Sequence, residues 1–108
     1  MYAADAGKEI MPGVRQVELG EWPIAIATYK KAVMNDYIVA PGSGFPVDTM
    51  KNDMVCIILE GKFDVKQDGK PFTADTGHVF TCATGQTEED TNPGDVAAVM
   101  RVIDFMAT

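Results

Sequence analysis

The chain has 108 residues, 46% of them hydrophobic, and its sixteen acidic and nine basic residues give a net charge of −7. This length suits one domain with a single modest core. A negative field without a cluster of Lys and Arg beyond Lys30 and Lys31 argues against binding to nucleic acid or to an anionic membrane surface. No apolar run approaches the ~20 residues that a membrane-spanning helix needs.

The first residues, Met1 to Ile10, contain neither the basic region nor the apolar region of a secretory signal. Cys56 and Cys82 both lie among apolar neighbours. We therefore expect a cytoplasmic protein with reduced thiols.

The elements predicted along the chain are short strands separated by turn residues. Residues 1–20 contain Pro12-Gly13 and an alternating segment, and we expect an N-terminal arm or an extra strand there, before a barrel domain over residues 21–108. Asp68-Gly69 is typical of a type I′ hairpin turn, and Asn92 to Asp95 of another turn. The expected strands are Ile24–Tyr29, Asp36–Ala40, Met54–Leu59, a segment around Phe63 and Val65, His78–Cys82 and Val96–Phe105. No amphipathic helix is evident, so the sequence predicts an all-β barrel or sandwich.

Two sets of glycines have a regular spacing. From Gly42, five residues lead to Asp48, one more residue to Met50, three more to Met54 and six more to Gly61. From Gly77, the corresponding spacing is five residues to Ala83, one to Gly85, two to Glu88 and three to Asn92. Glycines at barrel corners permit sharp bends, and the residues between them point alternately inward and outward.

These two frames resemble the two motifs of the cupin family, over about residues 24–105. The resemblance implies a single-domain jelly-roll β-barrel. In cupins with complete motifs, three histidines and a glutamate hold a divalent metal. Here the corresponding positions hold Asp48, Met50, Met54 and Glu88.

These replacements change the chemistry of the implied site. Thioethers are soft, weak ligands for the metals of the family, so we expect that the metal site is lost and that no cofactor is bound. A first alternative is a weakly held divalent metal, such as Mn²⁺ or Mg²⁺, on Asp48 and Glu88. A second is a Cu(I) or thiol site that adds Cys56 and Cys82 to the methionines; simple filling of the barrel by Met and Cys is favoured over it. The predicted ligand pocket comprises Asp48, Met50, Met54, Cys56, Phe80, Cys82 and Glu88.

Other residues have simpler interpretations. His78, the only histidine, is expected in a turn, away from any ligand position. Asp53 could replace Met54 in a metal site only through a register slip that reverses its side chain. Trp22 and Tyr37 are interpreted as packing or interface residues. The last two acids of the run at residues 88–90, Glu89 and Asp90, are interpreted as solvated loop charges.

No nucleophile–base pair is evident, so no catalytic residue is predicted. We expect a non-catalytic small-ligand-binding or accessory subunit. Because the run Val55–Leu59 is apolar on both faces of its strand, we also expect a homodimer or a place in a larger assembly. The alternative is a metal-dependent small cupin enzyme acting on a small organic acid, a sugar or a sulfur compound, with Asp48 and Glu88 as unusual ligands.

Overall fold

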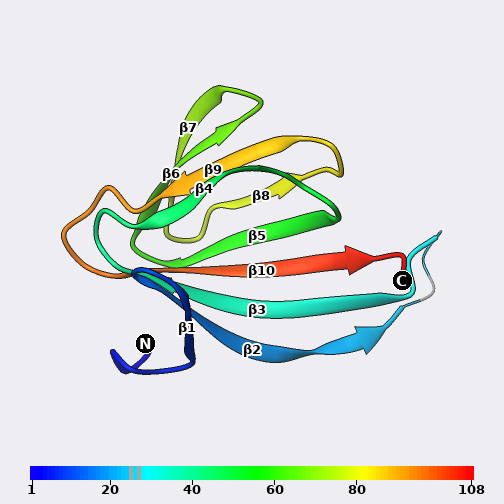
Figure 1. Ribbon diagram of the computed structural model, residues 1–108, viewed down its shortest axis with the longest axis horizontal. Coiled ribbons are helices and arrows are strands. Elements are labelled where there is room, and N and C mark those ends of the chain that lie inside the picture. The colour runs from blue at the N-terminus through cyan, green and yellow to red at the C-terminus, as the bar shows by residue number, and fades with distance from the viewer. Residues whose placement is uncertain (25, 27) are drawn as a thin grey trace.

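The computed structural model describes residues 1–24, 26 and 28–108. These residues form ten β-strands and no helix (Figure 1). The strands are β1 (Lys8–Met11), β2 (Val14–Pro23), β3 (Lys31–Val39), β4 (Gly44–Thr49), β5 (Asp53–Glu60), β6 (Lys62–Gln67), β7 (Lys70–Asp75), β8 (Val79–Cys82), β9 (Thr87–Thr91) and β10 (Ala98–Met106).

The strands form two antiparallel sheets. The larger has six strands in the order β1-β2-β3-β10-β5-β8, and the smaller has four in the order β4-β9-β6-β7. The long strands β2, β3 and β10 run along the length of the molecule, and the smaller sheet lies over one side of them (Figure 1). Strands far apart in sequence pair in both sheets, which gives the all-β jelly-roll arrangement that the sequence predicts.

Most of the expected strands are confirmed, with ends displaced by a few residues. Asp68 and Gly69 have φ values of 50° and 80°, as the predicted type I′ turn between β6 and β7 requires. The alternation in residues 1–20 corresponds to β1 and most of β2, which pairs with β3 and continues to Pro23 without a break.

The strand expected over Ile24–Tyr29 is wrong at its described positions. The Ile24 N–H donates to the carbonyl of Lys30 at 2.8 Å, and the Tyr29 N–H donates to that of Ile26 at 3.0 Å. These local bonds form the loop between β2 and β3, and the described residues of the segment lie outside any strand. Ala25 and Ala27 lie outside the described residues.

The glycine frames have a conformational basis. Gly42, Gly61, Gly77 and Gly85 all have φ between 73° and 90°, the left-handed region that favours glycine. At Gly61 a Cβ would also meet the Cβ of Ala98 at 2.9 Å. These glycines therefore turn the chain between strands of the two sheets.

Asn92 ties the end of β9 to the larger sheet. Its side chain is 1% exposed; its amide N–H groups donate to the carbonyls of Val39 and Val96, at 3.0 and 2.8 Å, and its Oδ1 accepts from the N–H of Gly94. These side-chain hydrogen bonds hold the end of β3 and the turn into β10, so Asn92 is a structural residue.

The core fills one end of the space between the sheets. Phe63 and Val65 of β6 are fully buried against Ile58 of β5 and Val39 of β3. Burial of a side chain such as Phe63 contributes roughly 2–3 kcal/mol. This packed end fixes the separation of the sheets and thereby the width of the space beside it.

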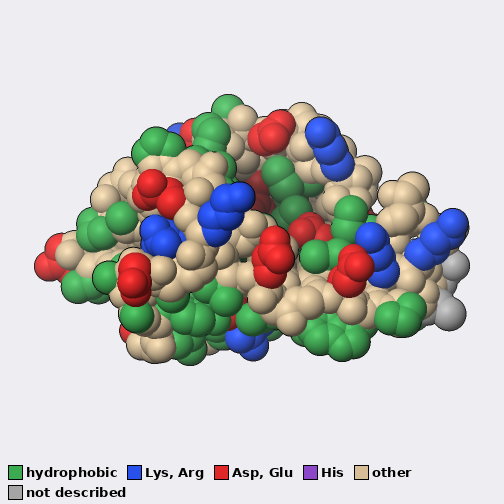
Figure 2. All heavy atoms as spheres, turned by 60° about the horizontal axis from the view of Figure 1, so that its bottom comes forward, with side chains coloured by type: hydrophobic (Ala, Val, Ile, Leu, Met, Phe, Trp, Pro, Cys, Tyr) green, Lys and Arg blue, Asp and Glu red, His purple; other side chains and the backbone are tan. Residues whose placement is uncertain are grey.

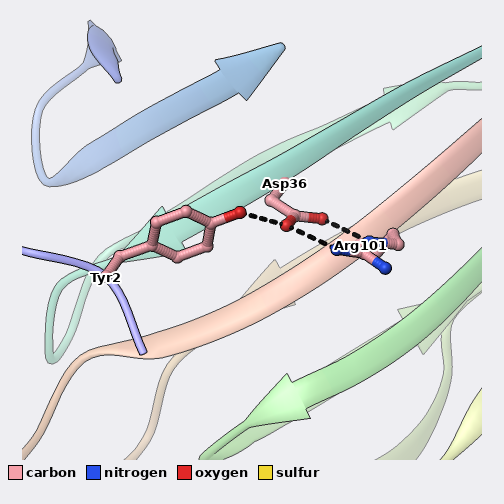
Figure 3. A network of polar contacts seen from close by, with 3 residues as sticks. All are labelled: Tyr2, Asp36 and Arg101. Carbon is pink, nitrogen blue, oxygen red and sulfur yellow. Dashed lines mark hydrogen bonds and ion pairs between the residues drawn. The ribbon is translucent and has the colours of Figure 1, made fainter. Parts of the chain in front are cut away.

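A buried ion pair lies on the opposite, outer face of the larger sheet. Asp36 of β3 and Arg101 of β10 are direct cross-strand partners, and Arg101 donates to both carboxylate oxygens at 2.8 and 3.0 Å. Figure 3 shows the Tyr2 hydroxyl from the N-terminal segment donating to the same carboxylate. Asp36 is 0% exposed, and these bonds compensate the removal of its charge from water.

Candidate functional site

A cavity of about 270 Å³ lies between the two sheets, beside the packed core. Tyr37, Cys56 and Met100 line it from the larger sheet, and Phe45 and Glu88 from the smaller one. Figure 2 shows the molecule hollowed near its middle, with hydrophobic and acidic side chains inside the hollow. Its position between the inner faces of the sheets is where small barrels hold ligands.

The structure brings most of the predicted pocket residues together. The residues of that set that line the cavity are Asp48, Met50, Met54, Cys56 and Glu88. Phe80 and Cys82 are not among its lining residues in the described part of the chain.

The register of β5 with β8 explains the positions of Phe80 and Cys82. Met54 lies opposite Cys82, and Cys56 opposite Phe80, so all four share the inner face of this strand pair. Cys82 is nevertheless buried at 1% exposure, and Phe80 packs edge-on against Phe72 with ring centroids 5.3 Å apart. The two residues therefore lie behind the cavity wall.

The interpretation of Asp90 as a solvated loop charge is wrong. Residues 87–91 form β9, in which Glu88 and Asp90 are 4% and 5% exposed and both line the cavity. Glu89, between them, points to the other face and is half-buried. β9 lies between β4 and β6, so its alternate side chains are directed inward whatever their charge.

The two buried acids differ in their partners. Glu88 Oε1 accepts a hydrogen bond of 2.9 Å from the Gln67 side-chain amide, which also donates to the carbonyl of Thr81 at 2.8 Å. Asp90 Oδ1 is buried without a hydrogen-bond partner. Asp90, a residue of the cavity wall, therefore has one oxygen that lies beneath the accessible surface and makes no hydrogen bond.

The surroundings of Asp90 favour its protonated form. Burial, and then a hydrogen bond with Glu88 and the charges of Glu88 and Glu89, raise the pKa of Asp90 to about 9. Burial also raises the pKa of Asp104, which lines the cavity from β10. These directions indicate a site with low dielectric constant and excess negative charge.

The cysteines are free and buried. Burial first, and then the charge of Glu88, raise the pKa of both thiols, that of Cys82 to about 12. Because the thiolate is the nucleophile, neither side chain is activated as a nucleophile by its surroundings.

The residues at the cupin metal positions do not fit the metals of that family. Asp48 is exposed, and its Oδ1 accepts from the N–H of Thr49 at 2.8 Å. Met50 and Met54 offer only thioethers, which leaves Glu88 as the one buried hard ligand. Within residues 1–24, 26 and 28–108, no group of three or more His, Cys, Asp or Glu side chains is arranged to hold a metal ion.

Asp53 and His78 lie outside the site. The Asp53 carboxylate accepts hydrogen bonds from the Tyr29 hydroxyl and from Thr84, whose N–H and hydroxyl donate at 2.7 and 3.0 Å. The slip that would replace Met54 by Asp53 does not occur, because Met54 is in register with Asp104. His78 is exposed ahead of β8, as its interpretation as a turn residue predicts.

Sequence reasoning missed part of the apolar wall. Met11 from β1 and Met100 from β10 line the cavity, and Tyr37, interpreted as a packing or interface residue, lines it edge-on to Phe45 at a centroid distance of 5.1 Å. For Met100 a signal exists, since Met100, Val102 and Asp104 alternate along one strand face. For Met11 we find none in the sequence.

Comparisons with known proteins find the same fold in solved structures of low sequence identity. No family model matches the sequence, and no curated protein matches it. Among solved structures, a cupin 2 conserved barrel domain protein from Salinispora arenicola has a TM-score of 0.77 at 20% identity over 99% of this chain and 87% of its own. The Schizosaccharomyces pombe Cnp3 cupin domain has a TM-score of 0.73 at 18% identity, over 89% of this chain.

A predicted oxalate decarboxylase from Thermotoga maritima has a TM-score of 0.70 at 15% identity, over 86% of this chain and 80% of its own. This chain spans 66% of the length of the Cnp3 domain. At these identities the likeness shows the fold alone. The chain has the cupin fold that its glycine frames predict. No helix in the described residues is long and apolar enough to cross a membrane.

Proposed function

We propose that this cupin-fold chain is a non-catalytic binding module, whose cavity holds a small, partly apolar ligand without a metal. The observation that carries the proposal is the buried Asp90 Oδ1, an acceptor without a partner in a wall that is otherwise mostly apolar. A pocket with apolar walls and a few placed polar groups is the usual form of a small-molecule site.

The alternative is a metal-dependent enzyme acting on a small organic acid, sugar or sulfur compound, and it has less support. Its two hard ligands, Asp48 and Glu88, are opposite each other on β4 and β9, but Asp48 lies at the exposed rim. Glu88 already accepts a hydrogen bond from Gln67. The decarboxylase named above shares the fold, and a fold hosts many unrelated activities.

We also propose that the chain acts as a homodimer or as a subunit of a larger assembly. Val55 and Ile57 are half-buried on the outer face of the larger sheet, and Trp22 and Val79 on the same face are 45% and 56% exposed. Apolar side chains at such positions favour burial against another protein surface. The two free thiols support a reducing compartment such as the cytoplasm.

The test is elemental analysis together with native mass spectrometry of the gently purified protein. We expect no stoichiometric transition metal and a mass increment from a non-covalently bound small molecule, lost on denaturation. A stoichiometric metal that disappears in Glu88→Ala and remains in the control Glu89→Ala would establish the enzyme alternative instead.

A further inference from the structure

We infer that the ligand of the cavity is a small organic cation: an amine whose protonated nitrogen lies against Glu88 and Asp90 and whose apolar body lies among methionine side chains. The inference rests on the proposed binding role and names the chemical class of the ligand. Three properties of the cavity support it: its charge, its free acceptor and its walls.

The charge of the cavity has one sign. Its ionisable lining residues are acids, and no Lys, Arg or His of the described chain lines it; the acids are Asp48, Glu88, Asp90 and Asp104. They come from β4, β9 and β10, and because burial raises the pKa of Asp90 and Asp104, the negative charge of the site rests on Glu88 and Asp48 of the smaller sheet. An anionic ligand would be repelled there, whereas an ammonium group gains Coulomb energy that is larger than in water.

The free acceptor requires a donor. An unsatisfied buried polar atom costs about 1–3 kcal/mol, and Asp90 Oδ1 is such an atom on a side chain that is 5% exposed. Gln67, the amide that donates to Glu88, makes its second bond to the carbonyl of Thr81. An ammonium group carries several N–H donors, so it can bond the Glu88 carboxylate, and a rotation of the Asp90 side chain toward the cavity would bring Oδ1 to the same nitrogen.

The walls suit an apolar body. Sulfur contacts aromatic rings favourably, and the faces of aromatic side chains attract cations. Tyr37 and Phe45 supply rings beside the thioethers. The thioethers are those of Met11, Met50, Met54 and Met100. A volume of about 270 Å³ equals roughly nine water molecules in the liquid, which sets the ligand at about ten non-hydrogen atoms.

The methionines also provide the assay. Of the seven methionines, Met11, Met50, Met54 and Met100 line the cavity, whereas Met1, Met34 and Met106 do not and serve as internal references. The protein with ¹³C-labelled methionine methyl groups is titrated at neutral pH with three probes of nearly equal size: benzylammonium, benzyl alcohol and benzoate. The chemical shifts report where each probe binds and how tightly.

We expect benzylammonium to shift the four cavity methyl signals and not the reference signals. It should bind at least tenfold more tightly than benzyl alcohol, and benzoate should show no measurable binding in the cavity. If benzyl alcohol or benzoate binds in the cavity as tightly as the amine, the inference is overturned and the binding role stands. If no probe shifts the cavity signals, both are contradicted.

Matched variants locate the cation. Glu88→Gln and Asp90→Asn keep the shape of each side chain, and Glu89→Gln makes the same change of charge on the other face of β9. We expect Glu88→Gln to weaken benzylammonium binding about tenfold or more and Glu89→Gln to leave it within about twofold, since hydrogen bonds to charged groups contribute roughly 1.5–3 kcal/mol. Equal losses in the two glutamate variants would overturn the assignment. Unchanged methionine spectra without probe verify that the variants fold.

Discussion

Two aspartates are buried in different parts of the fold, Asp36 on the outer face of the larger sheet and Asp90 between the two sheets, and they differ in their hydrogen-bond partners. Asp36, on the outer face of the larger sheet, is 0% exposed and receives hydrogen bonds from Arg101 and Tyr2 (Figure 3). Asp90, in the cavity wall, is 5% exposed, has an oxygen without a partner and lies beside another acid. The hydrogen bonds of Asp36 explain why it can be buried in this fold. The burial of Asp90, one oxygen of which has no partner, requires a further explanation.

The unpaired oxygen of Asp90 departs from the usual pairing of polar groups in a stable core. Buried polar groups in folded proteins are almost always paired, and exceptions concentrate at functional sites. In the described chain, Asp90 Oδ1 is the buried side-chain atom without a partner. If Asp36 is structural and Asp90 functional, substitutions at the two sites and changes of pH affect stability differently.

The largest loss of stability from a single substitution is expected from Arg101→Met. This change removes the bidentate partner of Asp36 and leaves a carboxylate that is 0% exposed without its counter-charge. Breaking a buried ion pair in this way destabilises by about 3–5 kcal/mol, and we expect the lower end because the Arg101 side chain is 36% exposed. Urea unfolding measures the loss. A change below about 1 kcal/mol would show that the pair does not stabilise the fold.

The second prediction concerns pH. Because the pKa of Asp90 is raised to about 9 in the folded protein, the folded state keeps a proton that the unfolded state loses above about pH 4. This contribution to stability is complete below about pH 4 and is lost as the pH rises toward 9, by up to about 1.4 kcal/mol per unit.

The difference in unfolding free energy between the protein and Asp90→Asn, measured from pH 4 to pH 9, isolates this effect from other groups, including Asp104, whose pKa is also raised. We expect the protein to lose stability relative to the variant across that range. A constant difference would contradict the protonated state of Asp90.

A smaller effect is expected from Tyr2→Phe. The change removes one hydrogen bond to the Asp36 carboxylate but leaves both bonds from Arg101. We expect a loss of about 1 kcal/mol in thermal or urea unfolding. Tyr29→Phe, which removes a hydroxyl that donates to the more exposed Asp53, provides a comparison of the same chemistry. An equal or larger loss in that variant would show that Asp36 has no special dependence on its partners.

The smallest effect is expected from Asp90→Asn at pH 4. The amide is neutral like the protonated acid, so we expect the unfolding free energy to change by less than about 1 kcal/mol. Asp36→Asn at the same pH replaces a charge that Arg101 requires and should destabilise by more. If Asp90→Asn destabilises more than Asp36→Asn, Asp90 is the structural residue of the two.

The sequence predicts the frame of this fold well because the frame depends on local conformation. Gly42 and Gly61 need positive φ, and Asn92 bonds within the turn that it begins, so their spacing alone places the strands around them. The same frame places Glu88 at the cavity. It does not extend to Ile24–Tyr29, where alternation of the sequence predicts a strand and the described residues form a loop.

The pairs that distinguish the two aspartates could not be predicted, because they depend on distant strands. Asp36 and Arg101 are 65 residues apart and meet only through the register of β3 with β10. Asp90 lies in an acidic run that looks like a loop, and its burial depends on β4 and β6 on either side of β9. The alternate positions of Glu88 and Asp90 are consistent with one inward strand face, but acidic side chains are usually exposed, so the sequence favours a loop.

The most direct test of the account is the ionisation of Asp90 itself, followed through the ¹³C signal of its side-chain carboxyl group and assigned with Asp90→Asn. We expect this carboxyl group in the ligand-free protein to stay protonated at neutral pH and to ionise near pH 9, because it is buried and hydrogen-bonded to Glu88. Ionisation near pH 4, the ordinary range of an aspartate, would contradict the account.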